Sequence, residues 1–402
     1  MNEYIQAVAR IMAREWRRIA SRKSLYLLMI VLPVILFLAV AAIYRSEVVK
    51  DLPVAVLDGD HSEISRTIVR AVASDRLFKI VAEVQSVSAI EEGIRAGRIQ
   101  GAFYLPKGME RNIKRGEPAR MVVYRNHINL LSGNMIYKEG VTISRTISAG
   151  ILMKKLGSRG LGAGQAIALA NPVSVDAQPL FNPAYNYANY LVPGLLPALM
   201  QMLIMLVAVL VISAEYHEGT LPGLFRMAHG RAGAVLLGKS LPHLLLHGAT
   251  ALGLIGIIFP LFHIPVAGSI GQLFALMLLF IAASFFLGLM ISTLVHNQML
   301  ATEAAVFINT PAFMFSGYTY PLWGMPGIHQ LFAQIMPFTH FLTAFIKVYQ
   351  MGAPLRALRH EIEILASFVL ITVLVSWAVL HYRGRHLPAP GPIASDREGG
   401  AR

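Results

Sequence analysis

The stretch that decides the fold is SLPHLLLHGATALGLIGIIFPLFHIPVAGSIGQLFALMLLFIAASFFLGLMISTLVHNQMLAT, residues 240–302, which contains no Asp, Glu, Lys or Arg. A transmembrane helix needs about 20 apolar residues, because it rises about 1.5 Å per residue and the hydrocarbon core is about 30 Å thick. The stretch is long enough to cross a membrane more than once, and breaks at residues 262–269 and 296–298 divide it. It predicts the third and fourth membrane spans, counted from the N-terminus, and the start of a fifth.

Further uncharged stretches predict the other spans, since a charged side chain costs ~2.5–3.5 kcal/mol at the centre of an inserting helix. The predicted spans are residues 24–44, residues 190–213, three helices within residues 236–322, and residues 362–382. Residues 323–361 are apolar but broken by Pro337, so we expect a re-entrant segment of short helices there. If this segment crossed the membrane, the chain would have seven spans and its C-terminus would change sides.

The composition agrees with a membrane protein. Of the 402 residues, 55% are hydrophobic and only 14% are charged, with a mean hydropathy of +0.56, whereas soluble chains carry about 25% charged residues. This excludes a wholly soluble enzyme. The 35 Lys and Arg against 22 Asp and Glu do not gather in one basic stripe, so we predict no nucleic-acid partner. The chain has no cysteine, which excludes disulfides and thiolate chemistry.

The N-terminal residues 1–23 set the predicted orientation. They are rich in arginine, which favours the cytoplasmic side, and six spans return the C-terminal tail, residues 383–402, to the same side. Placed on a helix, apolar residues fall on one side and Arg10, Arg14, Arg17 and Arg18 on the other. This pattern predicts an amphipathic helix on the inner leaflet, in contact with membrane lipids; a helix packed on a partner is the alternative. The basic region is too long for a cleaved signal peptide, so the first span is expected to be an uncleaved anchor.

Residues 45–189 are predicted to form an extracytoplasmic α/β domain inserted between the first and second spans. The expected strands are residues 52–58, 77–84, 101–106 and 119–126, and a long helix is expected at residues 130–156. Ser62 and Ser88 are the expected helix caps. Asp58, Asp60 and His61 are close in sequence, but this pattern after a strand is more typical of a turn and helix cap than of a metal site. We predict no catalytic residue and no metal site, and expect a binding or docking module.

Residues 233–240, GAVLLGKS, match the G-x-x-x-x-G-K-S pattern of a phosphate-binding loop. That chemistry needs a loop after a buried strand, whereas these residues begin the third membrane helix. We therefore expect Lys239 to anchor the helix end at the cytoplasmic interface. Without a nucleotide site in the chain, the energy for transport must come from a partner or from an ion gradient.

The layout and three stretches of sequence resemble the permease subunit of ABC-2-type ATP-binding-cassette exporters, in the branch with a large extracytoplasmic domain. Residues 213–241 resemble the family's E-x-x-x-G-T-L-x-x-L cytoplasmic loop, although His217 and Pro222 depart from its usual residue types. Residues 315–349 resemble its re-entrant segment, with the break at Met336-Pro337, and residues 96–124 resemble a segment of the external domain of drug-exporting members. The resemblance covers almost the whole chain.

The resemblance implies an α-helical polytopic protein of the bacterial cytoplasmic (inner) membrane that exports an amphipathic or drug-like substrate. The implied partners are cytoplasmic ABC ATPase subunits, which hold ATP and magnesium, a second permease copy, and in some exporters a periplasmic adaptor; the chain itself would carry no cofactor. The resemblance assigns the loop at residues 214–235 to contact with the ATPase. An exposed apolar cluster with a charged rim would suit such docking. The expected coupling residues are Glu215, Glu218, Gly219, Thr220, Leu221, Leu224, Phe225 and Arg226. Gly219 is expected to let the chain leave the second span, and Thr220 to cap the short helix that follows. Leu221, Leu224 and Phe225, with Met227, are expected to form the exposed apolar cluster.

Two other functions stay open on the sequence alone. A proton-coupled secondary transporter would need acids within the membrane, and Glu303 is the one acid within the fourth-to-sixth-span region, so it is the candidate substrate-pathway residue. The alternative is that Glu303, at a helix end near His296 and Gln298, simply reaches the membrane interface. His243 and His247 lie one turn apart on the third span, where they could relay protons, bind metal or simply satisfy backbone carbonyls. The second alternative is a membrane-anchored receptor or adaptor whose external domain binds a ligand or an envelope partner.

The predicted topology can be tested by cysteine labelling, because the chain has no native cysteine. Cysteines at Ser88 and Ser158 should react with an impermeant thiol reagent added outside intact cells, and a cysteine at Ser395 should react only after the membrane is opened. Protection of both Ser88 and Ser158 variants in intact cells would contradict the topology.

Overall fold

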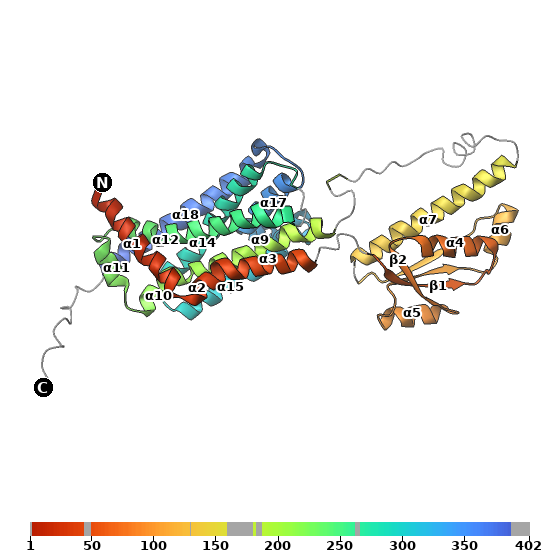
Figure 1. Ribbon diagram of the computed structural model, residues 1–402, viewed down its shortest axis with the longest axis horizontal. Helices are drawn as coiled ribbons and strands as arrows, with labels where there is room; N and C mark the ends of the chain where they lie inside the picture. Colours follow the sequence, from red (N-terminus) through yellow and green to blue (C-terminus); the bar gives the residue numbers. More distant parts are fainter. Residues whose placement is uncertain are drawn as a thin grey trace, which may run out of the picture. The chain divides into compact units, whose positions relative to one another are not determined.

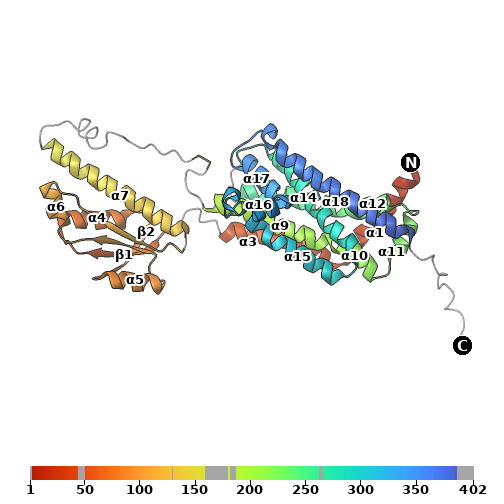
Figure 2. The same ribbon diagram turned by 180° about the vertical axis from the view of Figure 1, so that it is seen from behind.

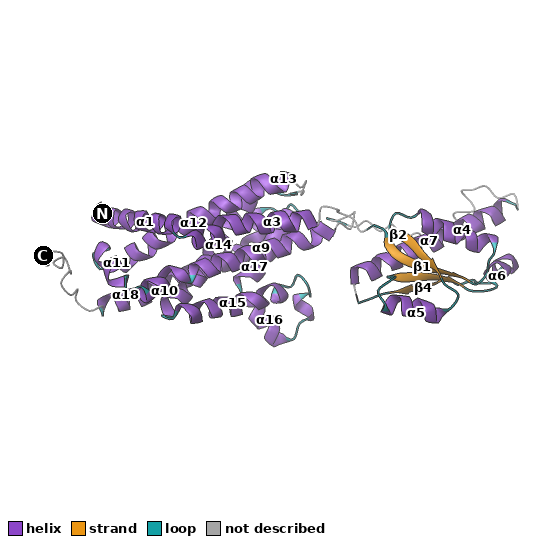
Figure 3. Cartoon of the chain, turned by 60° about the horizontal axis from the view of Figure 1, so that its bottom comes forward, coloured by secondary structure: helices purple, strands orange, loops and turns teal. Residues whose placement is uncertain are grey.

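The structure is a computed structural model that describes residues 2–43, 50–128, 130–158, 180–181, 187–261 and 266–386. The chain divides into two compact units. One, Met1–Glu47 with Leu180–Arg402, is built of helices, and the other, Val48–Pro179, contains the β-strands (Figures 1 and 3). Residues 262–265 of the predicted break and residues 387–402 of the C-terminal tail lie outside the described residues.

The described part of the helical unit contains α-helices, two π-helical segments (η1 and η2) and two 3₁₀ turns (η3 and η4). In chain order they are α1 Asn2–Ser21, α2 Lys23–Tyr26, η1 Leu27–Val31, α3 Leu32–Ile43, α9 Tyr187–Ala208, α10 Leu210–His217, α11 Leu221–Met227, α12 Ala232–Gly253, η2 Leu254–Ile258, α13 Phe259–Leu261, α14 Ile270–Leu294, α15 Gln298–Phe315, η3 Leu322–Gly324, α16 Gly327–Gln334, α17 Pro337–Tyr349, η4 Leu355–Leu358 and α18 Arg359–Arg385.

Five helical runs in the described residues are long and apolar enough to cross a membrane. They are Lys23–Val40, Tyr190–His217, Ala232–Ile257, Ile270–Leu294 and Leu355–Arg385. Helices α16 and α17 would make a sixth if they form one broken span, but they meet at a bend of 81° next to Pro337. The prediction of a helical, multi-pass membrane protein is confirmed at this level.

Helix α15 is the exception among the predicted spans. It lies beside α9 and α14 in the bundle (Figure 2), but its composition does not place it among the five apolar runs. The reason is its polar content, which includes Thr302, Glu303, Asn309 and Thr310. Asn309 accepts a hydrogen bond of 2.8 Å from the buried Gln201 of α9, so part of this polarity serves helix packing.

Helix α14 lies at the centre of the bundle and packs against α9, α12, α17 and α18. In lipid, apolar burial supplies little drive for helices to associate, so close packing must supply it. Gly288 permits such an approach, because a Cβ there would lie 2.7 Å from the Cβ of Ala208 on α9. Towards α17, Phe280 and Phe341 stack with ring centroids 3.8 Å apart.

The α/β unit contains a four-stranded sheet in the order β2-β1-β3-β4. Its elements are β1 Leu52–Asp58, α4 Glu63–Ser74, β2 Phe78–Glu83, α5 Val87–Arg95, β3 Gly101–Leu105, α6 Met109–Arg115, β4 Val122–Arg125 and α7 Leu130–Gly157. β1 pairs in parallel with β2 and β3, and β4 pairs antiparallel with β3. Helices α4 and α7 cover one face of the sheet and α5 the other (Figure 1).

Most of the predicted elements of this unit are present within a few residues of their expected ends. Ser62 caps α4 as predicted, in a reciprocal pair with Ser65. The prediction for Ser88 was wrong, because the residue that caps α5 is Ser86, whose hydroxyl accepts from the backbone N–H of Ala89. Ser88 lies in the first turn of that helix and its hydroxyl is 2.9 Å from that of Ser86.

Asp58 and Asp60 hold the turns around β1, and the described residues contain no group of side chains suited to a metal ion. Asp60 accepts backbone hydrogen bonds from Gly108 (2.6 Å), Met109 (3.0 Å) and Glu110 (2.9 Å), at the start of α6. Burial opposes ionisation of Asp60, but these bonds, led by the one from Glu110, hold its pKa below the ordinary value. Asp60 thereby joins segments that are distant in sequence.

We expect Asp60→Ala to destabilise the start of α6 by about 1–3 kcal/mol, since it leaves backbone donors without their acceptor. Hydrogen–deuterium exchange at residues 108–110 should accelerate, while Glu117→Ala, an exposed control, should leave it unchanged. Because the pKa of Asp60 is lowered on folding, the stabilisation is complete above the unfolded pKa and is lost as the pH falls through the folded one. The difference between wild type and variant should therefore shrink in strong acid, and a difference that grew there would contradict this role.

Candidate functional site

The connection between α10 and α12 is a short structured segment at one end of the helical unit. Gly219 adopts a left-handed conformation, with φ of +66°, and lets the chain leave α10, as the sequence predicts. Thr220 then precedes α11, but its hydroxyl donates to Glu215 (2.5 Å) and makes no cap bond to the helix. The prediction that Thr220 caps the helix with its side chain was therefore wrong.

Glu215 is fully buried and lies at the centre of an ion cluster. Arg14 of α1 binds it with two hydrogen bonds of 3.0 and 2.9 Å, and Arg18 binds the same carboxylate. Lys239 of α12 donates to it at 2.8 Å. One carboxylate thus joins α1, α10 and α12, which lie together in Figure 1. Because a buried charge is costly unless it is paired, the three helices must keep their positions relative to one another.

Glu15 is the second buried carboxylate of the cluster. It accepts from the Nζ of Lys239, and its other oxygen lies 3.0 Å from Nε2 of His243. Burial alone would raise the pKa of Glu15, but the nearby Lys239, followed by His243, lowers it to about 2. Lys239 is itself fully buried between Glu15 and Glu215, so the prediction that it anchors the helix end at the membrane interface was wrong.

Glu218 extends the cluster to the surface, where it pairs with Arg18 (3.4 Å) and Arg22 (2.5 Å). Arg14, Arg18 and Arg22, spaced one helical turn apart, thus pair in succession with Glu215 and Glu218. Arg14 and Arg18 were expected to face away from the apolar side of α1, and the structure instead turns them to the acids of α10 and its C-terminal end.

Helix α1 packs against α12, and the glycines of the phosphate-loop-like stretch explain how. A Cβ on Gly238 would lie 2.7 Å from Ile11, and a Cβ on Gly233 would lie 3.1 Å from the hydroxyl of Tyr4. Both glycines are helical residues of α12 that face α1. The spacing that resembles a nucleotide loop is therefore a helix-packing surface, and the lysine after it is held by two glutamates.

The sequence contained a signal for this packing. Ile11, Glu15 and Ile19 follow at four-residue spacing, so they share one face of α1, and all are buried. An acid in such an apolar row needs a buried cation as partner, and Lys239 of α12 is that cation. The expected site therefore included Glu215 and Glu218 but missed Glu15, Arg14, Arg18 and Lys239.

The apolar residues of the connecting segment do not form an exposed patch. Leu221, Leu224 and Phe225 are buried in the main core of the helical unit. Phe225 also packs against α18, since a Cβ on Gly384 would lie 2.3 Å from its ring. The exposed-patch prediction was wrong because the tertiary partners of these side chains are distant in sequence. The exposed side chains here are polar: His217, Glu218, Arg226, His229 and Arg231.

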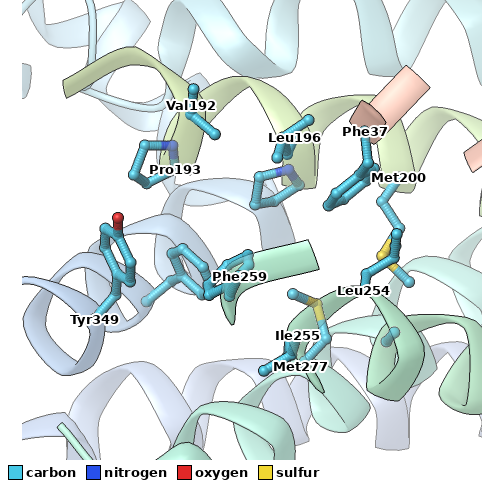
Figure 4. A pocket seen from close by; sticks show the side chains of 13 residues that line it. Phe37, Val192, Pro193, Leu196, Met200, Leu254, Ile255, Phe259, Met277 and Tyr349 are labelled. Atoms are coloured by element: carbon cyan, nitrogen blue, oxygen red, sulfur yellow. The ribbon is translucent and has the colours of Figure 1, made fainter. Parts of the chain in front are cut away.

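Glu303 lies apart from the ion cluster, on the exposed face of α15. It lines a groove of about 870 Å³ whose other walls come from α15 and α16. A second cavity lies inside the bundle among α3, α9, α12, η2, α13, α14 and α17, where Phe37, Leu196 and Phe259 face it (Figure 4). This second cavity has a volume of about 20 Å³, room for about one water molecule, so of the two only the groove could hold a drug-sized molecule.

His243 and His247 do not act as a pair in the structure. His243 faces Glu15 and stacks on Phe285, with ring centroids 5.6 Å apart. His247 is buried, and its Nε2 has no hydrogen-bond partner among the described residues. The described residues hold no group of His, Asp and Glu arranged for a metal ion.

Comparison with known proteins identifies the relatives of this chain. The profile of the ABC-2 family transporter protein matches residues 23–378. The chain is 22% identical over 382 residues to the Probable multidrug ABC transporter permease YbhS of Escherichia coli K12, covering 90% of this chain and 94% of that protein. It is 28% identical over 175 residues to the permease YbhR of the same strain, covering 44% and 47% of the two chains. ABC transporter G family member 20 of Dictyostelium discoideum is 27% identical over 219 residues, 54% of this chain and 28% of that protein.

We expect Lys239→Met to destabilise the helical unit by about 3–5 kcal/mol, because it leaves two buried carboxylates without their shared cation. Adding Glu15→Gln should recover part of this loss, since the double variant no longer buries the Glu15 charge. Thermal unfolding of purified full-length protein in detergent measures both effects, and Lys155→Met, at an exposed position, is the control. A single variant as stable as the wild type would show that the cluster does not hold α1 in place.

Proposed function

Because the chain belongs to the ABC-2 transporter family, we propose that it is the permease subunit of an ATP-driven exporter of the bacterial cytoplasmic membrane. Its substrate is amphipathic or drug-like, and separate ATPase subunits supply the energy. The multi-pass helical unit and the multidrug names of the YbhS and YbhR relatives support this proposal. They favour a permease over a receptor or adaptor and over a proton-coupled transporter.

The ion cluster is the observation that carries the coupling part of the proposal. The ATPase would bind the exposed side chains of the segment between α10 and α12, where Arg226, His229 and Arg231 form a basic surface. The same segment is fixed from behind by buried Leu224 and Phe225. A displacement imposed there therefore cannot be absorbed by a loose loop, because interior packing is dense and stiff.

The displacement would reach the membrane through the paired charges. Glu215 ends the second span and binds both α1 and Lys239 of the third span. The three helices should consequently shift together when the segment moves. ATP and magnesium belong to the partner ATPase, where hydrolysis occurs, while this chain converts the movement into opening of a substrate route, together with a second permease copy. A periplasmic adaptor would extend that route in an envelope with two membranes.

The proposed orientation places both termini in the cytoplasm and the α/β unit outside. The arginines of α1 and those at the end of α18 lie at the same end of the bundle, since Arg383 contacts the ring of Tyr216 at 4.9 Å. Arginine at that end agrees with a cytoplasmic position. In this orientation the segment between α10 and α12 faces the ATPase.

We expect Arg226→Glu together with Arg231→Glu to reduce copurification of the ATPase by about tenfold or more, because reversed charges repel the acidic surface that complements them. The variant should still insert and unfold at the wild-type temperature, since both side chains are exposed. Copurification from membranes, followed by ATP-dependent transport in vesicles, measures the effect.

Arg115→Glu, an exposed charge reversal in the α/β unit, is the matched control and should retain the ATPase. The isolated chain should not hydrolyse ATP, and Lys239→Ala should not alter nucleotide binding by whatever complex assembles. Wild-type chain that purifies without any ATPase and transports without ATP would refute the proposed function.

A further inference from the structure

The groove between α15 and α16 has a composition that suits one class of ligand. One exposed stripe of α15 forms a wall, with Glu303, Phe307 and Thr310 at helical spacing. Ile328 and Phe332 of α16 form the other wall, and the two helices lie side by side (Figure 3). The lining contains one carboxylate, one histidine, His329, which stacks on Phe315, and no Lys or Arg.

Glu303 is the unusual member of this lining. None of the described residues forms an ion pair or a hydrogen bond with its carboxylate, in contrast to Glu15 and Glu215, each of which has several partners. A carboxylate on the outer face of a helix in a membrane bundle is costly unless a cation or water meets it. A positively charged ligand would therefore complement the carboxylate of Glu303 in this groove.

The remaining walls suit the rest of such an occupant. Phe307 and Met314 are 78% and 66% exposed, which gives the groove a broad apolar surface. Phe315 and Phe332 meet edge to face, with centroids 5.2 Å apart. Aromatic faces attract cations as well as apolar groups, and a volume of about 870 Å³ lies within the range of about 300–1,000 Å³ typical of drug-sized ligands.

We propose that this groove binds an amphiphilic cation, with its positive group at Glu303 and its apolar body against the apolar wall of α15 that begins at Phe307. The inference rests on the proposed export function and names the substrate class of that function. Thr302 and Thr310, which also line the groove, fit the same role, whereas Asn309 serves helix packing. A second copy of the chain is the other occupant that could cover this face, and the experiment separates the two.

The test measures equilibrium binding of radiolabelled tetraphenylphosphonium to purified full-length chain in lipid nanodiscs. Tetraphenylborate, which has the same shape and the opposite charge, is measured on the same preparation. Glu303→Gln should weaken binding of the cation by about tenfold or more relative to the anion, and Glu303→Asp should retain most of the preference. The ratio of the two affinities does not depend on the fraction of folded protein. Glu363→Gln, which removes an exposed carboxylate from α18, is the control and should leave the ratio unchanged.

An unchanged ratio in Glu303→Gln would overturn the proposal, and so would equal affinity of the wild type for both ions. Phe307→Cys chains that cross-link to one another at a rate unaffected by tetraphenylphosphonium would show that a second copy fills the groove, which also overturns it. These outcomes are independent of the ATPase. Charge-selective binding could persist in a chain that never recruits an ATPase, and an ATP-driven exporter could lack this selectivity, so the two proposals fail separately.

Discussion

The pairing of one buried lysine with two buried glutamates is the constraint on which the helical unit depends. Lys239 lies in the bundle interior, where burying an unpaired ammonium would cost several kcal/mol in desolvation free energy. Its partners come from α1 and α10, so neither helix can leave without exposing a buried charge to an apolar environment. Glycines at the α1–α12 contact then permit the close approach that this pairing requires. The cluster therefore fixes the positions of α1, α10 and α12 relative to one another. This arrangement matters more than the net free energy that the cluster adds to folding.

This ion cluster changes how the segment between α10 and α12 should be understood. A coupling surface could be an apolar patch that a partner covers, but here the apolar side chains already pack into their own bundle. What stays at the surface is polar and mainly basic. Recognition of a partner by such a surface depends on charge and geometry, and it leaves the buried side of the segment free to transmit movement. In the proposed mechanism, the exposed side of the segment between α10 and α12 binds the ATPase and its buried side transmits the movement.

Much of the fold could be predicted from the sequence because its signals are local. Absence of charge marked the membrane helices, a short apolar run marked β1, and apolar residues at helical spacing after the Ser62 cap marked α4. The errors share a physical cause. Thr220, Lys239 and Leu224 were assigned roles by their neighbours in sequence, whereas their partners lie on other elements. Tertiary pairing of this kind leaves a trace in one sequence only when a residue breaks a pattern, as Glu15 does in the apolar row of α1.

The acidic residues that interrupt apolar stretches of the helical unit are of two kinds, those with a cationic partner in the chain and those without one among the described residues. Glu15 and Glu215 break the apolar pattern, and cationic side chains of the same chain form ion pairs with their carboxylates. Glu303 breaks the pattern of α15 without such a partner among the described residues, and it faces a groove rather than a neighbouring helix. For α1, by contrast, α12 supplies a buried cation opposite the acid. Under the proposed export function, the partner of Glu303 is a cationic ligand that binds and is released.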